Sequence, residues 1–233
     1  MNEAWLADLA ERFWTAAGGP PRPPRDIQAA VSLVLPVTVV FLPMLGLERI
    51  EAWLERRSIP YRFESGNRRL RGCLVASGGH GIIFVDGAEP EDERRFTIAH
   101  EVAHFLLDYH EPRERALRAI GPGVLDVLDG RREPTPEERV HSALTGCPLG
   151  VHAHLMERSG DAGARAAAVE YRADRLAWEL LAPASELRRI DDARLEAVLR
   201  DRYGLPRGEA ERYARELSRS RRPRTYLEWL SAP

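Results

Sequence analysis

The feature that most constrains the fold is a pair of histidines inside an otherwise apolar stretch, His100-Glu101-Val102-Ala103-His104. The flanking residues Phe96, Ile98, Ala99, Phe105, Leu106 and Leu107 leave no continuous polar face, so a helix here must be buried. Ionisable side chains in a buried helix are costly to desolvate unless a partner satisfies them, and a bound cation does so directly. The pattern therefore predicts a buried helix that carries a metal site.

The spacing of the two histidines fits a single ion. Residues i and i+4 lie about 40° apart around a helix axis and one turn apart along it, so His100 and His104 can direct nitrogens at one point. Glu101 lies beside that point and is suited to act as a general base, taking a proton from a water molecule whose pKa zinc lowers to about 7. The motif predicts zinc-assisted hydrolysis with Glu101 as the catalytic residue.

A catalytic zinc usually has three protein ligands and one open position, so a third ligand is needed. His110 has the spacing of the longer HExxHxxGxxH motif, but Leu107 stands where that motif has glycine. A helix that continues past Leu107 would place His110 about 240° around from His104, facing away. The second candidate, Glu170 in Glu170-Tyr171-Arg172-Ala173-Asp174, is favoured over His110.

The surroundings of Glu170 support this choice. Glu170 lies on an expected helix at 164–182, where Ala173 and Ala177 are small enough to let a second helix approach closely. Asp174 follows one turn after Glu170 and is placed to accept a hydrogen bond from the far nitrogen of a zinc-bound histidine. Such a bond would fix the tautomer of that histidine.

The stretch 95–107, together with Glu170-x-x-Ala173-Asp174 and Leu180-Leu181-Ala182-Pro183, resembles the ImmA/IrrE family of metallopeptidases. The ExxAD element is also similar to that of the membrane CAAX-prenyl proteases. The resemblance covers about residues 48–183 and implies a small α+β, zincin-like fold with a short sheet packed beside the HExxH helix. It further implies Zn²⁺ held by His100, His104 and Glu170 around Glu101, and a protein substrate such as a helix-turn-helix repressor.

The chain departs from compact family members between His104 and Glu170, where the connection is longer. Gly121-Pro122-Gly123 and Pro134-Thr135-Pro136 interrupt short helical pieces there, and we interpret 111–163 as a helical insertion. Loops on a rigid scaffold commonly carry specificity, so the insertion is a candidate lid or recognition element.

Three parts are expected along the chain: an N-terminal helix and Pro-rich linker at 1–25, the metallopeptidase domain at 26–183, and a C-terminal helical extension at 184–233. Helices are expected at 3–16, 47–57, 90–109, 164–182, 186–203 and 208–218, and strands at 61–63, 70–76 and 82–85, the last two forming a hairpin.

The uncharged stretch 27–47 raises the alternative of a membrane-anchored protease. Pro36, Pro43 and the β-branched cluster at 37–40 instead favour a helix that ends before a buried strand. The acidic, amphipathic N-terminal residues lack the pattern of a secretory signal. Cys73 and Cys147 form neither a metal knuckle nor a CxxC motif, so a cytoplasmic location is expected.

Charge composition gives little support to nucleic-acid binding. The 34 basic and 36 acidic residues leave a net charge of −2, so direct binding of nucleic acid is not expected. The arginine run at Arg219, Arg221, Arg222 and Arg224 follows a possible helical pair and leaves an alternative, a DNA- or protein-binding regulator on a zincin scaffold. A solvated C-terminal segment is the simpler interpretation.

The remaining histidines are expected to be exposed or hydrogen-bonded. His141, His152 and His154 lie within the expected insertion and could suggest a second metal site. Alternate residues on a helix diverge by about 200°, which opposes a shared ion between His152 and His154.

Overall fold

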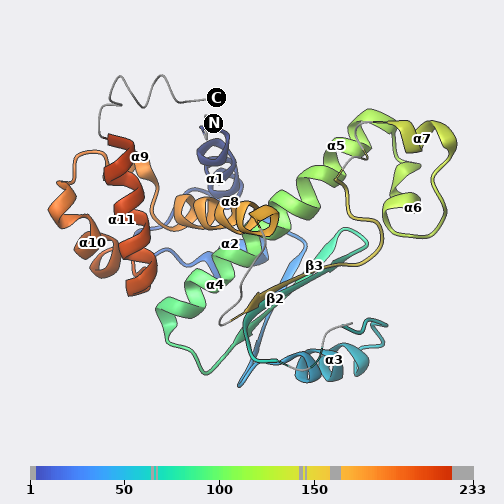
Figure 1. The fold of residues 1–233 in the computed structure, drawn as a ribbon, viewed down its shortest axis with the longest axis horizontal. Coiled ribbons are helices and arrows are strands. Elements are labelled where there is room, and N and C mark those ends of the chain that lie inside the picture. The colour runs from blue at the N-terminus through green and yellow to red at the C-terminus, as the bar shows by residue number, and fades with distance from the viewer. Residues whose placement is uncertain are drawn as a thin grey trace.

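The computed structural model describes residues 4–63, 66, 68–141, 144, 146–157 and 164–221. Its strands form one four-stranded sheet in the order β1-β3-β2-β4, with helices on both faces (Figure 1). The strands are β1 (Val37–Leu42), β2 (Leu70–Ser77), β3 (His80–Asp86) and β4 (His152–Glu157). β1 runs parallel to β3, whereas β2 runs antiparallel to both β3 and β4.

Helices make up most of the regular secondary structure. They are α1 (Ala4–Ala16), α2 (Ile27–Val34), α3 (Leu47–Glu55), α4 (Glu91–His104), α5 (Glu111–Ile120), α6 (Val124–Leu128), α7 (Pro136–Val140), α8 (Ala164–Leu181), α9 (Ala184–Leu187), α10 (Asp192–Asp201) and α11 (Arg207–Arg221). A π-helical segment, η1 (Phe105–His110), joins α4 to α5. The predicted fold class, α+β with a short sheet beside the HExxH helix, is confirmed.

The predicted hairpin is confirmed as β2 and β3. Its turn contains Gly78 and Gly79 at φ 59° and 85°, the left-handed region that glycine enters without a steric penalty. The predicted strand at 61–63 is wrong, because no strand forms there. The backbone N–H of Phe63 donates instead to the Glu51 carboxylate of α3 at 2.8 Å, so this backbone group is satisfied outside any sheet.

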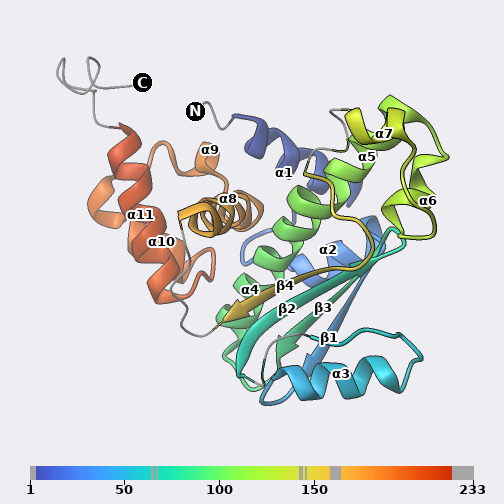
Figure 2. The same cartoon turned by 45° about the vertical axis from the view of Figure 1, so that its right-hand side comes forward.

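The two faces of the sheet support separate apolar cores (Figure 2). Residues that alternate along β2 and β3 explain this, because successive strand side chains point to opposite faces. Leu74 and Ile83 join the larger core with α4, whereas Val75 and Phe84 join the smaller core with α3. The sheet is therefore buried on both sides, and α4 lies directly against it.

The segment 27–47 forms a helix that ends before a strand, as predicted. Its residues make α2 and then β1, which pairs with β3 inside the sheet. Within the described ranges, no helix combines the length and apolar character needed to cross a membrane.

A helical pair forms near the C-terminus as α10 and α11, but the helix predicted at 186–203 is interrupted at 188–191, between α9 and α10. Arg221, part of the arginine run, is not free to meet a phosphate, because it donates to the Leu187 and Ile190 carbonyls and to the Asp192 carboxylate. Arg222 and Arg224 lie outside the described residues.

The segment 111–163 holds more than helices. After α5, α6 and α7 it forms β4, a strand that the sequence analysis did not predict, at the edge of the sheet beside β2. The segment therefore contributes an edge strand to the sheet that supports α4 (Figure 2), and this strand brings His152 and His154 near the HExxH helix.

Candidate metal centre

Helix α4 carries the HExxH residues into the interior. It begins after Pro90, and the acidic side chains of its first turn lie near the positive end of the helix dipole. From Phe96 onward every residue of α4 is buried; His100, Glu101 and His104 are 2%, 0% and 1% exposed. Burial this complete requires each of the three polar side chains to have a partner.

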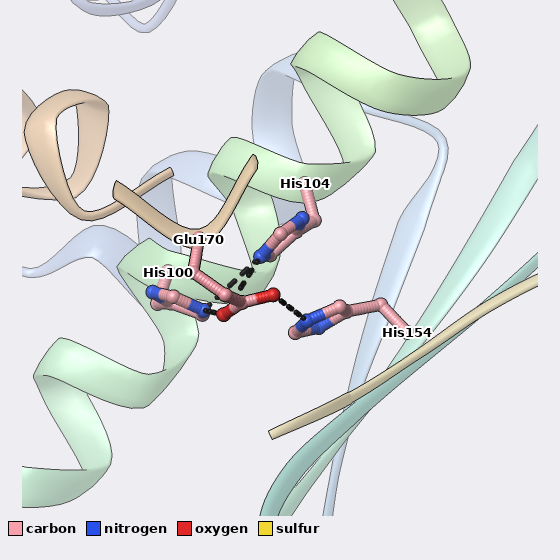
Figure 3. A group of neighbouring side chains, drawn as sticks. All are labelled: His100, His104, His154 and Glu170. Atoms are coloured by element: carbon pink, nitrogen blue, oxygen red, sulfur yellow. Dashed lines mark hydrogen bonds and ion pairs between the residues drawn. The ribbon is translucent and has the colours of Figure 1, made fainter. Parts of the chain in front are cut away.

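Helix α8 brings Glu170 to the two histidines. The facing surface of α8 includes Ala173 and Ala177, both fully buried, and α8 packs closely on α4. Glu170 Oε2 lies 3.3 Å from His100 Nε2 and 3.7 Å from His104 Nε2, and the two Nε2 atoms are 3.1 Å apart. The structure thus brings together the three residues that the sequence analysis named as metal ligands (Figure 3).

A fourth residue, His154, joins this group from β4. One ligand atom each from His100, His104, His154 and Glu170 lies within 4.8 Å of all the others (Figure 3). His154 is hydrogen-bonded, as expected, but the assumption that 152–154 is helical is wrong, because 152–157 is a strand. Alternate residues of a strand share one face, and both His152 and His154 are partly buried.

His110 is not part of the cluster formed by the described residues. The chain does not turn back after His104 but continues as η1 and then α5. This agrees with the argument from Leu107, since the longer motif needs a glycine at that position to reverse direction.

Each α4 histidine is held from behind by a carboxylate. His100 Nδ1 lies 3.0 Å from Asp174 Oδ1, the hydrogen bond predicted from the ExxAD spacing, and this prediction is confirmed. His104 Nδ1 lies 2.7 Å from Asp108 Oδ2, a contact that the sequence analysis missed. The spacing of four between His104 and Asp108 could have revealed it, because residues four apart are neighbours on a helix.

Arginines in turn hold these two carboxylates. Arg212 of α11 donates to Asp174, and Arg172 of α8 donates to Asp108. These contacts connect the C-terminal helical pair directly to the metal centre. They also keep both carboxylates charged, which fixes the histidine tautomer with the proton on Nδ1.

The electrostatics of the cluster favour positive charge at its centre. Burial acts to lower the pKa of His100, but hydrogen bonds with Asp174 and Glu170 outweigh this effect and raise the pKa to about 9. Burial also lowers the pKa of His154, and the charge of Glu101 with hydrogen bonds to Glu101 and Glu170 raises it to about 10. Burial raises the pKa of Glu170, yet hydrogen bonds with the three histidines hold it far below its ordinary range. Carboxylates around imidazoles create this preference.

The geometry fits zinc. With Nδ1 donating to a carboxylate, a neutral imidazole presents a lone pair at Nε2, so His100 and His104 direct two lone pairs at one point. The 3.1 Å between their Nε2 atoms is close to the about 3.3–3.4 Å expected for two donors of a tetrahedral zinc site. Two imidazoles and a carboxylate form a donor set that zinc commonly takes.

Glu101 is placed beside this point. Its Oε2 lies 3.0 Å from His154 Nδ1, and its buried Oε1 has no hydrogen-bond partner within the described part of the chain. Strand β2 passes closely at Gly72, where an added Cβ would lie 2.8 Å from Glu101 Oε1 and 2.6 Å from Thr97 Cγ2. The absence of a side chain at Gly72 gives Glu101 its space.

A cleft of about 850 Å³ opens onto His104 and His154. Its walls come from α1, from the η1–α5 junction and from the segment before β4, including Trp5, Leu107 and Pro148. A cleft of this volume can accept several residues of a peptide chain.

One comparison with known proteins gave a match. Residues 55–121 match the family model of the IrrE N-terminal-like domain of peptidase family M78. The match includes β2, β3 and α4, and therefore His100, Glu101 and His104, whereas Glu170 and His154 lie beyond it. Comparisons with curated proteins and with solved structures gave no match.

Proposed function

We propose that this protein is a zinc-dependent endopeptidase, because residues 55–121 match the model of the IrrE N-terminal-like domain of peptidase family M78. The observation that carries the proposal is the convergence of His100 and His104 of the buried helix α4 with Glu170 of α8 on one point beside the Glu101 carboxylate. Two neutral imidazoles with a carboxylate leave a fourth position for substrate, which is the arrangement of catalytic zinc sites.

The chain's own residues have separate roles in this mechanism. A zinc ion bound there supplies a Lewis acid that polarises a peptide carbonyl and acidifies water. Glu101 takes the proton of the attacking water and delivers it to the leaving amine. His100, His104 and Glu170 hold the metal, and Asp174 and Asp108 keep the two imidazoles in the binding tautomer.

We further propose a regulatory protein as the substrate, with a helix-turn-helix repressor as the first candidate, and a cytoplasmic setting. The cleft beside His104 and His154 is large enough for an extended peptide segment. Cys73 and Cys147 are not joined in a disulfide, which fits the reducing compartment proposed here. A repressor encoded beside this gene, incubated with the zinc-loaded enzyme, should be cut at one or a few sites.

The decisive experiment tests the role of the general base and the role of the metal ligand in separate variants. Glu101→Gln should retain one zinc per chain and lose peptide hydrolysis by about 10²–10⁴-fold, because the general base is gone. Glu170→Ala should lose zinc, measured by metal analysis after dialysis. Glu137→Gln, at an exposed position of α7, is the matched control and should retain both zinc and activity. Activity in Glu101→Gln, or full zinc content in Glu170→Ala, would contradict the assignments.

A further inference from the structure

Three histidines of the cluster share one arrangement. In each, Nδ1 faces a carboxylate: Asp174 for His100, Asp108 for His104, and Glu101 for His154. In each, Nε2 is the atom directed at the centre, and His154 Nε2 lies 2.9 Å from Glu170 Oε1. A carboxylate at Nδ1 orients an imidazole for metal binding through Nε2, and the third histidine has it as the first two do.

We propose that His154 is a fourth zinc ligand that closes the metal centre until substrate displaces it. This inference rests on the proposed zinc site, whose other ligands are His100, His104 and Glu170. The four ligand atoms lie within 4.8 Å of one another, compared with about 3.3–3.5 Å in a tetrahedral zinc site. A contraction of at most about 1.5 Å between the ligand atoms therefore completes the coordination.

The consequence for the mechanism follows from the coordination number. Zinc sites with four protein ligands are closed, whereas hydrolysis needs an open position for water or substrate. While His154 occupies that position, its Nδ1 also engages Oε2 of Glu101, the proposed base. One displacement of His154 therefore opens the metal and releases Glu101 at the same time.

The position of His154 suits a displaceable ligand. It lies on β4, the edge strand of the sheet, whose ladder is with β2 alone, and His154 is paired in register with Leu74. Its side chain is 13% exposed and borders the cleft, so an entering peptide meets it directly. The ligands on α4 are more deeply buried, so a similar displacement would require the tightly packed core around them to rearrange.

X-ray absorption spectroscopy at the zinc edge tests the proposal, because it counts the imidazoles bound to the metal. The zinc-loaded wild-type protein should show three imidazoles, and His154→Ala should show two with an added oxygen ligand. His152→Ala is the matched control, since it removes a histidine from the same strand and the same cleft but not from the cluster. It should retain three imidazoles.

A second measurement tests whether the fourth ligand closes the site. Acetohydroxamate, a small zinc-binding probe, should bind the cobalt-substituted His154→Ala protein about tenfold tighter than wild type, as expected if the open form makes up about 10% of the wild-type population. The apparent zinc affinity of His154→Ala, from chelator competition, should fall by at least about tenfold. Circular dichroism should show that the variant is folded, and His154→Gln provides a second variant of similar size.

The outcomes separate this inference from the proposed function. Wild-type protein with zinc bound by two imidazoles and a carboxylate would overturn the role of His154 and leave the peptidase proposal intact. Equal probe affinity in wild type and His154→Ala would also overturn it. A wild-type protein that binds no zinc would overturn both.

Discussion

The two sides of the metal centre are built differently. On the helix side, His100 and His104 are 2% and 1% exposed and each is held by a carboxylate that an arginine holds in turn. On the strand side, His154 lies on an edge strand, is 13% exposed at its side chain and has its ring hydrogen-bonded to Glu101 and Glu170 of the centre itself. The difference indicates that the helix side holds its metal ligands in fixed positions, whereas His154 on the strand side can move. Changes on the helix side should therefore cost stability and metal binding, and changes on the strand side should mainly alter access.

The largest effect is expected where α4 and α8 pack together. Ala177→Leu adds a bulky side chain at a fully buried position of α8, and overpacking of this kind lowers the free energy of unfolding by about 1–3 kcal/mol. Urea unfolding measures the change. Ala168→Leu, the same substitution at an exposed position of the same helix, should stay within about 0.5 kcal/mol of wild type. Equal effects in both variants would refute the idea that close packing of α4 and α8 fixes the ligands on the helix side.

The carboxylates behind the α4 histidines should have the next largest effect. Asp174→Asn and Asp108→Asn remove the charge that orients His100 and His104, and each should weaken zinc binding by about 10–100-fold. Competition with a chelator measures this loss. Asp126→Asn, at a site remote from the cluster, serves as the control and should leave zinc affinity unchanged. If both variants bound zinc with wild-type affinity, the carboxylates would not fix the helix-side ligands, and the contrast between the two sides would be lost.

Gly72 tests the spacing where the sheet meets the helix. In Gly72→Ala the added methyl group would press on Glu101 Oε1 and Thr97 Cγ2, so the proposed base shifts and the rate of peptide hydrolysis should fall by about tenfold. Zinc content should stay near wild type, because the ligands lie on other residues. Adding Thr97→Ser removes one of the two contacts and should restore part of the rate. Gly208→Ala, with nothing within 4 Å of the new methyl group, should have no effect on hydrolysis.

The smallest effect is expected far from the centre, in the segment that precedes β4. Thr135 and Glu138 form a capping box at the start of α7 on the exposed surface. Thr135→Ala should lower the free energy of local opening of α7 by about 0.5–1 kcal/mol, because the helix loses its N-cap. Faster amide hydrogen exchange in α7 measures this change. Zinc affinity should not change. A loss of zinc affinity would show that this segment supports the metal centre more directly than its contacts indicate.

Local spacing explains what the sequence could predict on the helix side. The separation of four between His100 and His104 and the separation of four between Glu170 and Asp174 both describe single helix faces. Such patterns are visible without knowledge of the rest of the fold. The hydrogen bond between Asp174 and His100 was predicted in this way and is confirmed, whereas the roles of Glu101 and Glu170 in catalysis and metal binding stay predictions.

The strand side depends on contacts that are distant in sequence. His152-Ala153-His154 has little intrinsic β preference, and it becomes a strand because it pairs with Leu74 and Ala76 of β2. No pattern in the sequence of residues 152–154 indicates that pairing. The reverse error, a predicted strand at 61–63, has the same cause, since aromatic residues there pack beside α3 and find no strand partner.

The contact between α1 and α8 has a consequence during synthesis. The indole N–H of Trp14 donates to the Leu180 carbonyl, across 166 residues of chain. At ribosomal rates of about 5–20 residues per second, roughly 10–30 s pass between the appearance of one partner and the other. Through that interval the buried residues of α1, among them Leu6, Phe13 and Trp14, lack their contacts with α8 and have only early partners such as α2. The metal centre likewise can be completed only after that interval, because Glu170 lies on α8.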